Sequence, residues 1–243
     1  MSVSCLVRNF SRYAELSARD TAFLLRFEEK PKHYPPGVNV IAQGVPADHL
    51  YVLSSGWCFV KYDQPNGSRQ VLDVCHGGDI VGMREVCFER SICGMQTLSE
   101  SVLCAFPKIY LTEMFDEHPR LAGILFLAGM RREALLIERV VNLGRRTAYA
   151  RLCHFVSEMK QRIDHVNDVA TATFDVPIPA PLLADILGMS EMHTYRMLKR
   201  MGDERLASFD NGRFDLHDAA GLRTAASFRD DYLLLDRSWL PAK

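Results

Sequence analysis

The residues best suited to bind another molecule are clustered in the stretch PAPLLADILGMSEMHTYRMLKRM, which runs from Pro179 to Met201. Pro179 and Pro181 suit the first turn of a helix, where a missing N–H group costs no hydrogen bond. Gly188 can end this helix in a sharp turn, and the Ser190 hydroxyl can cap a second helix. The stretch therefore predicts two short helices joined by a tight turn.

The second of these helices is expected to be amphipathic, with one face for packing and one for binding. Small or apolar residues recur at i, i+3, i+4 and i+7 and would form the buried stripe: Thr194, Met197, Leu198 and Met201. The opposite face would carry Met192, Arg196, Lys199 and Arg200. These residue types at these offsets are typical of a helix-turn-helix that binds DNA. Two amphipathic helices of an ordinary bundle are the alternative interpretation.

Two short β-type runs follow the helix pair. They cover residues 206–209 and 213–216, and Asp210-Asn211-Gly212 lies between them. Asparagine and glycine are common in tight turns, so a hairpin is expected here. This hairpin would be the wing of a winged helix-turn-helix.

Composition sets limits on what the whole chain can be. With 243 residues, 48% of them hydrophobic and 24% charged, the chain resembles a globular protein of two domains. The net charge is −1, and residues 139–213 carry 11 Lys/Arg against 9 Asp/Glu, so bulk charge does not argue for DNA binding. The sequence predicts no membrane span and no secretion signal, which favours the cytoplasm.

The cysteines and the absence of catalytic motifs each exclude a class of protein. The seven cysteines are scattered with no C-x-x-C pair, which argues against a disulfide framework or a zinc site: Cys5, Cys58, Cys75, Cys87, Cys93, Cys104 and Cys153. No nucleophile elbow, P-loop, dinucleotide fingerprint or H-E-x-x-H motif occurs, so the sequence does not indicate an enzyme.

The N-terminal half is expected to be a helix followed by a small β domain. Helical spacing runs from about Ser11 to Phe27, and Asn66-Gly67 is a strong hairpin signal. Seven β-type runs punctuated by glycine cover residues 38–42, 50–53, 58–62, 70–74, 80–81, 95–98 and 102–106. Many short strands at regular intervals predict a sandwich or small barrel.

A long helix is expected from Pro119 to about Leu143. Residues at alternating steps of four and three would form a coiled-coil seam: Ala122, Phe126, Gly129, Glu133, Leu136, Val140 and Leu143. A second apolar stripe comprises Leu121, Leu125, Ala128 and Leu135. We therefore expect a homodimer, with one buried helix inside a single subunit as the alternative. Thr147 would cap the next helix. The apolar residues of the C-terminal extension would pack back on the body: Phe228, Tyr232, Leu233, Leu234, Leu235 and Trp239.

The order of these elements resembles the Crp/Fnr family, whose founding member is the catabolite activator protein. Four stretches carry the resemblance over nearly the whole chain: LYVLSSGWCFVKY with HGGDIVG, the seam helix, LGRRTAYARLCHF, and LLADILGMSEMHTYRMLKRM. The resemblance implies an α+β protein with a jelly-roll sensor domain like those that bind cyclic nucleotides (residues 1–118), a dimerisation helix (119–143) and a winged helix-turn-helix with a C-terminal extension (144–243).

The resemblance also implies partners and DNA-binding residues. The partners would be double-stranded DNA with a near-palindromic operator, a second copy of the chain, and RNA polymerase. Arg196 matches the family's guanine-reading arginine, while Ser190 and His193 match phosphate-contacting positions. The full expected set is Ser190, Glu191, Met192, His193, Tyr195, Arg196, Lys199 and Arg200. The alternative is a ligand-gated module that binds other proteins and does not act through DNA.

The expected effector region departs from the cyclic AMP pattern of the family. Gly82 is followed by Met83-Arg84 where a Gly-Glu-Leu motif is expected, which argues against cyclic AMP. The candidate pocket comprises Gly82, Met83, Arg84, Arg90, Ser91, Leu136 and Ile137. Cys5 alone near the N-terminus argues against an iron–sulfur cluster. Heme would need ligands such as Cys75, His76 or Met83, and Cys75 or Cys104 could sense oxidants. The effector stays unknown, as do the operator, the regulated genes and the choice between activation and repression.

Overall fold

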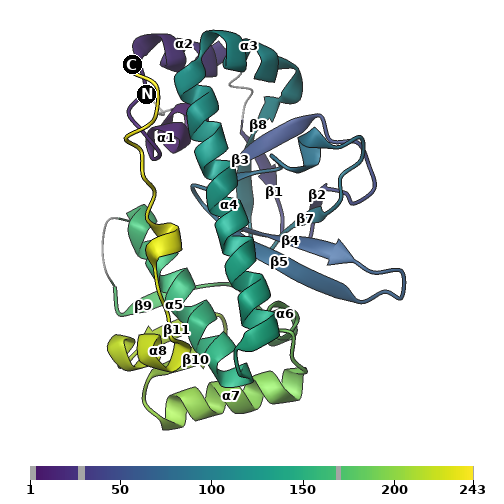
Figure 1. The fold of residues 1–243 in the computed structure, drawn as a ribbon. Coiled ribbons are helices and arrows are strands. Elements are labelled where there is room, and N and C mark those ends of the chain that lie inside the picture. Colours follow the sequence, from purple (N-terminus) through teal and green to yellow (C-terminus); the bar gives the residue numbers. More distant parts are fainter. Residues whose placement is uncertain (1–3, 27–30, 168–170, 243) are drawn as a thin grey trace. The chain divides into compact units, whose positions relative to one another are not determined.

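The computed structural model describes residues 4–26, 31–167 and 171–242 (Figure 1). They divide into two compact units. The first unit contains residues 1–68, 73–133 and 235–243, and the second contains 69–72 and 134–234. Both helices and strands are plentiful, which confirms the predicted α+β class.

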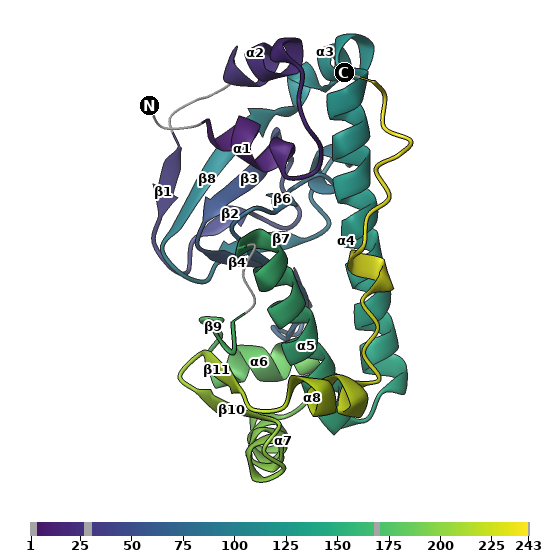
Figure 2. The ribbon, with the colours of Figure 1, turned by 90° about the vertical axis from the view of Figure 1, so that its left-hand side faces the viewer.

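Two antiparallel four-stranded sheets form the β domain, with strand orders β1-β8-β3-β6 and β2-β7-β4-β5 (Figure 2). Their strands are β1 (Lys32–Tyr34), β2 (Asn39–Ile41), β3 (His49–Ser55), β4 (Trp57–Asp63), β5 (Arg69–His76), β6 (Ile80–Val81), β7 (Gly94–Thr97) and β8 (Ser101–Pro107). In the pairing of β3 with β8, Leu50 faces Phe106 and Val52 faces Cys104. All four side chains are buried, so alternate residues of these strands build the core.

Each of the seven β-type runs became a strand, and β1 was missed. Its three residues, Lys32 to Tyr34, are too few for an alternating pattern and two of them are exposed. The short strand exists because it pairs with β8, from Lys32↔Leu103 to Tyr34↔Ser101. Long-range pairing of this kind leaves no local signal in the sequence.

The single helix expected from Ser11 to Phe27 is wrong: the structure has α1 (Cys5–Ser11) and α2 (Ala18–Arg26). Ser17 starts the second helix, because its Oγ accepts a hydrogen bond from the Asp20 N–H at 3.0 Å. The Asp20 carboxylate in turn accepts from the Ser17 N–H at 3.3 Å, which is a reciprocal capping box. Phe27, the expected end, lies outside the described residues.

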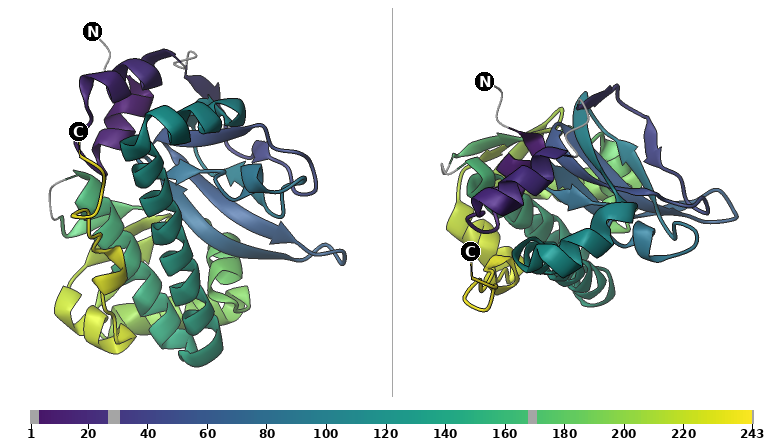
Figure 3. Two further views of the ribbon diagram at one scale, coloured as in Figure 1. Left: turned by 45° about the horizontal axis from the view of Figure 1, so that its top comes forward. Right: turned by 90° about the horizontal axis from the view of Figure 1, so that it is seen from above.

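The first unit also contains α3 (Leu111–Glu117) and the first half of α4 (Pro119–Arg145), which lie near α1 and α2 (Figure 3). Phe23 of α2 stacks on the ring of His118, with centroids 4.2 Å apart. The His118 ring in turn contacts the Asp20 carboxylate at 3.0 Å. One apolar core joins α1, α2, β3, β8 and α4. Two short 3₁₀ turns, Glu85–Cys87 and Lys108–Tyr110, complete the unit.

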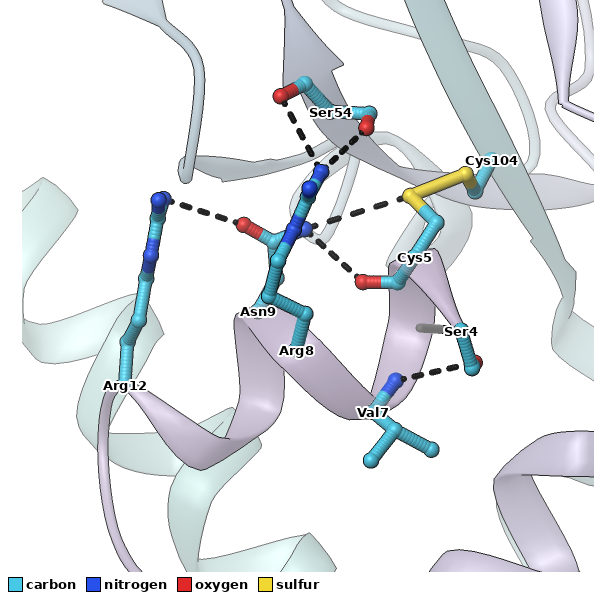
Figure 4. Close-up of a disulfide and its surroundings, with 8 residues drawn as sticks. All are labelled: Ser4, Cys5, Val7, Arg8, Asn9, Arg12, Ser54 and Cys104. Atoms are coloured by element: carbon cyan, nitrogen blue, oxygen red, sulfur yellow. Dashed lines mark hydrogen bonds between the residues drawn. A yellow bond between two sulfur atoms is a disulfide. The ribbon is translucent and has the colours of Figure 1, made fainter. Parts of the chain in front are cut away.

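A disulfide links Cys5 of α1 to Cys104 of β8 (Figure 4). The expectation that cysteines form no disulfide framework therefore needs correction for this one pair, while the other five cysteines are free. The Asn9 side chain donates to the Cys5 carbonyl at 2.8 Å, and Arg8 donates to the Ser54 hydroxyl at 2.6 Å. The disulfide and the Arg8 contact hold α1 against the sheet, while the Asn9 bond lies within the helix. A pairing over 99 residues cannot be read from cysteine spacing.

Reduction of this disulfide is expected to lower the midpoint of thermal unfolding. A cross-link over 99 residues restricts the unfolded chain and stabilises the fold by roughly 2 to 4 kcal/mol. A Cys5→Ser variant should unfold at the temperature of the reduced protein, with or without reductant. Alkylation of the oxidised, denatured chain should label five cysteines. Equal midpoints for oxidised and reduced protein would contradict the expectation.

The second unit contains the second half of α4 and the C-terminal helices and strands. These are α5 (Ala148–Asn167), β9 (Thr173–Asp175), α6 (Ala180–Leu187), α7 (Glu191–Asp203), β10 (Ala207–Asp210), β11 (Arg213–Leu216), α8 (Ala219–Ala226) and the 3₁₀ turn Asp231–Leu233. Thr147 Oγ1 accepts from the Ala150 N–H at 3.3 Å, which confirms it as the cap of α5.

Polar side chains are buried where α5 meets α4 and the segment after α8. Glu158 is 2% exposed and lies 3.7 Å from Arg139 and 3.6 Å from Arg162. Its carboxylate also accepts from the Tyr232 hydroxyl at 3.0 Å. Buried charges need such partners, because an isolated one costs several kcal/mol. The contact also confirms that part of the C-terminal extension packs back on the body.

Acid is expected to destabilise this unit through His154. Burial, followed by the charge of Arg146, lowers the pKa of His154 to about 4. In the unfolded chain its pKa is about 6.5, so between pH 6.5 and 4 only the unfolded state binds the proton. The contribution of neutral His154 to the free energy of unfolding is therefore fully present above pH 6.5. It is lost as the pH falls from 6.5 to 4, and the loss is about 3 kcal/mol at most.

Chemical denaturation of the parent and a His154→Gln variant at several pH values between 4 and 7 measures this effect. The difference in free energy of unfolding between the two proteins should shrink as the pH falls, because glutamine does not titrate. Two parallel stability curves across the window would show that His154 is not the responsible group.

Candidate nucleic-acid interface

Helices α6 and α7 form the predicted helix pair with its sharp turn (Figure 2). Gly188 ends α6 in the left-handed conformation, with φ 61°, and its N–H donates to the Ala184 carbonyl. A Cβ atom at this position would lie 2.8 Å from Leu143, so both conformation and space favour glycine. Ser190 Oγ then accepts from the His193 N–H at 3.3 Å and caps α7, as predicted.

The inner face of α7 anchors the helix. Thr194 is 1% exposed and Met201 is fully buried, while Met197 and Leu198 are partly buried. The Thr194 hydroxyl donates to the Ser190 carbonyl at 3.1 Å. The predicted stripe is therefore buried at Thr194 and Met201 and partly buried at Met197 and Leu198.

The outer face of α7 presents both cationic and large apolar side chains to solvent. Met192 is 69% exposed and Tyr195 is 66% exposed. Arg196 and Lys199 are exposed as well, and within the described part of the chain neither side chain has an ion pair or a hydrogen bond. Side chains that are already paired would have to break contacts before binding phosphate or a base edge, whereas these two would not.

Arg200 differs from the other two cations of α7. Its Nε donates to Glu204 at 2.7 Å, and its guanidinium lies 3.9 Å from the centre of the Tyr149 ring. The Tyr149 hydroxyl donates to the same carboxylate at 2.5 Å. Arg200 therefore braces α7 against α5.

Two other expected DNA contacts differ in exposure. Glu191 is exposed, whereas His193 is partly buried.

The predicted wing is present and has a third strand that the sequence did not reveal. Strands β10, β11 and β9 form one antiparallel sheet, with Phe209 facing Phe214 and Phe214 facing Phe174. The rings of Phe174 and Phe214 stack with centroids 5.4 Å apart. Strand β9 has only three residues, too few for a clear sequence pattern, and it forms through pairing with β11. Arg213 of the wing is exposed.

The long helix α4 carries an exposed apolar stripe that coincides in part with the expected seam. Five large apolar side chains of α4 are at least 36% exposed: Phe126, Met130, Ile137, Val140 and Val141. Of the expected seam, Phe126, Glu133 and Val140 are exposed, whereas Ala122, Gly129, Leu136 and Leu143 are partly buried. The second stripe is confirmed as buried at Leu121, Leu125, Ala128 and Leu135. We call Phe126, Met130, Ile137 and Val140 the α4 stripe.

The candidate effector residues are mostly engaged with other parts of the chain. In the first unit, Arg84 pairs with Glu85 at 3.0 Å, and Arg90 donates to the Gly44 carbonyl at 3.0 Å. Ser91 is 2% exposed, while Gly82 occupies a turn with φ 83° and Met83 lies near Gly129. The remaining two candidates, Leu136 and Ile137, belong to the second unit.

An ion cluster that the sequence did not reveal joins α4 to β5 and the turn after it. Arg132 forms a close ion pair with Asp73, and its Nη2 lies 3.5 Å from Asp79. Its Nε donates to the Ile80 carbonyl at 3.1 Å. Cys75, another neighbour, is fully buried, and this burial raises the pKa of its thiol. Cys75 is therefore poorly suited to sense oxidants, since the thiolate is the reactive form.

Within the described residues, no group of three or more His, Cys, Asp or Glu side chains has a geometry that could hold a metal ion. None of the described helices is both long enough and apolar enough to cross a membrane.

Comparison with known protein families gives two matches along the chain. Residues 31–118 match the cyclic nucleotide-binding domain, and residues 150–225 match the Crp-like helix-turn-helix domain. The first match covers the two sheets, and the second covers α6, α7 and the hairpin. The sequence therefore predicted both kinds of domain correctly.

Individual relatives agree with these matches. A probable transcriptional activator of Rhizobium leguminosarum bv. viciae is 25% identical over 73% of this chain and 72% of its own length. The nitrogen fixation regulation protein FixK of Bradyrhizobium diazoefficiens is 23% identical over 88% of this chain and 90% of its own length. Among solved structures, FixK2 from Bradyrhizobium japonicum shares the fold, with a TM-score of 0.74 and 17% identity. The match covers 81% of this chain and 96% of the FixK2 chain. The chain belongs to the Crp/Fnr family of transcriptional regulators, which bind DNA through a helix-turn-helix.

Proposed function

We propose that this regulator reads a near-palindromic operator through α7, with Arg196 on base edges and Lys199 on phosphate. The outer face of α7 supports this most directly, because Arg196 and Lys199 are exposed and unpaired within the described residues. An arginine can bind guanine O6 and N7 with two hydrogen bonds, while lysine acts as a point charge. Ser190, Glu191, Met192, His193 and Tyr195 flank Arg196 and would supply further contacts.

We further propose that the protein acts as a homodimer joined along α4. The α4 stripe supports this, because Phe126, Met130, Ile137 and Val140 follow at steps of four, seven and three, which is heptad spacing. Exposed apolar side chains in such a row favour burial against a like helix. Two copies of α7 would then read half-sites about 34 Å apart.

Control by the sensor would act through α4. Residues 119–133 of this helix belong to the first unit and residues 134–145 to the second. A change in the ion cluster of Arg132 with Asp73 and Asp79 would therefore act on the helix that carries the α4 stripe. Because Arg84 and Arg90 of the candidate effector pocket already have partners, the proposal does not depend on a cyclic nucleotide.

The relatives' names suggest the direction of regulation. The protein of Rhizobium leguminosarum bv. viciae is called a probable transcriptional activator. By analogy, the DNA-bound dimer would contact RNA polymerase and activate transcription in the cytoplasm.

A gel shift with a pool of near-palindromic duplexes tests the proposal, followed by a salt titration of the selected duplex. If six or more phosphates are contacted, affinity should fall by about 10³-fold between 50 and 200 mM salt, because binding releases counterions. A scrambled duplex of equal length is the control. Indifference to every duplex would contradict DNA binding and favour the ligand-gated protein-binding module.

A further inference from the structure

The C-terminal segment Leu235–Ala242 belongs to the first unit rather than to the DNA-binding unit that precedes it in sequence. Leu240 is 9% exposed and lies in the same core cluster as Leu121 and Ile124 of α4. Arg120 donates to the Pro241 carbonyl and fixes the end of the segment. The segment is therefore docked on the N-terminal half of α4.

The docking depends on a glycine of α4. A Cβ atom at Gly123 would lie 2.9 Å from Leu240, 3.4 Å from Pro241 and 3.8 Å from Trp239. The segment thus approaches the helix backbone closely at this one turn. Such close packing positions the side chains on either side of Leu240, Trp239 among them.

Trp239 is held by this docked segment, yet it is not buried. It is 47% exposed, and its ring meets the ring of Phe126 edge to face, with centroids 5.9 Å apart. Phe126 is itself 58% exposed and is the first residue of the α4 stripe. Two large exposed aromatic rings therefore lie side by side at one end of the row of apolar side chains.

We infer that Trp239 is part of the homodimer interface, so that each copy adds its C-terminal segment to the seam made by the α4 helices. The inference rests on the proposed homodimer and extends it. Trp239 is continuous with the α4 stripe through Phe126, and tryptophan is enriched among the residues that dominate binding energy at interfaces. In a two-fold dimer each contact occurs twice, so one tryptophan per chain contributes two contacts to the stability of the dimer.

Sedimentation equilibrium of a Trp239→Ala variant tests the inference. We expect the dimer dissociation constant to rise at least tenfold. Ile109→Ala is the matched control, because Ile109 is 77% exposed and apolar but belongs to a 3₁₀ turn outside α4. This control should dimerise like the parent. A Trp239→Ala dimer as tight as the parent, or tighter, would overturn the inference.

Fluorescence gives a second test that leaves the seam intact. The chain has two tryptophans, Trp57 and Trp239, so a Trp57→Phe variant reports on Trp239 alone. On dilution its emission should shift to longer wavelength at the concentration where the sedimenting mass halves. An emission maximum that stays constant while the mass halves would overturn the inference even if Trp239→Ala misfolds.

These experiments separate the inference from the proposed function. A Trp239→Ala protein that dimerises normally and binds the operator overturns only the role of the C-terminal segment. A parent protein that stays monomeric at micromolar concentration overturns both the homodimer and the role of Trp239.

Discussion

Replacement of Arg196 by alanine is expected to weaken operator binding by about 1 to 3 kcal/mol for each half-site, which is roughly 5- to 150-fold. The loss should depend on sequence, because a bidentate guanidinium discriminates guanine from other bases. Selection of duplexes with the variant should therefore show relaxed preference at one position of each half-site. Affinity for non-specific DNA should change little.

The control for this experiment is Arg229→Ala, which removes the same charge from the same unit. Arg229 is exposed and pairs with Asp231, and exposed ion pairs contribute little to stability. This variant should bind the operator like the parent. If Arg196→Ala also bound every duplex like the parent, α7 would not be the reading helix.

Substitution of Ile137 by glutamate should dissociate the homodimer. Ile137 is 56% exposed in the isolated chain and lies in the middle of the α4 stripe. In a two-fold dimer the variant would place two carboxylates at the seam, where burying unpaired charge costs several kcal/mol. Light scattering should report a monomer at micromolar concentration, and operator affinity should fall more than 100-fold as simultaneous binding of two half-sites is lost.

Ile109→Glu introduces the same change at an exposed apolar residue outside α4 and should leave both properties intact. An Ile137→Glu protein that remains dimeric would show that the exposed stripe is not the seam. The seam expected from the sequence, through Gly129 and Leu136, would then be tested by a Leu136→Glu variant.

Local signals in the sequence were sufficient for the parts of the fold that depend on near neighbours. Gly188 and Ser190 set the turn of the helix pair within a few residues, and Asn66-Gly67 marked a hairpin between two apolar runs. The buried face of α7 followed from Thr194 and Met201 because helical spacing places them on one side.

Features that depend on distant partners could not be predicted in this way. Strands β1 and β9 have three residues each and form through pairing with β8 and β11. Cys5 and Cys104 are 99 residues apart. The ion cluster of Arg132 also joins residues more than 50 positions apart, Asp73 among them.

The α4 register shows a subtler limit. Two adjacent heptad patterns fit the sequence of this helix, and both contain Phe126 and Val140. Which of them faces solvent is decided by how the helix packs on the rest of the chain, since that packing buries one side. The exposed fractions favour the row through Met130 and Ile137.

Hydroxyl-radical footprinting of the selected operator tests most directly whether two α7 helices read one duplex together. Two protected segments should appear, related by a two-fold axis and centred about 10 base pairs apart, since each helix would enter a successive major groove. Protection of a single segment, or of segments whose spacing does not match one helical turn, would contradict the account.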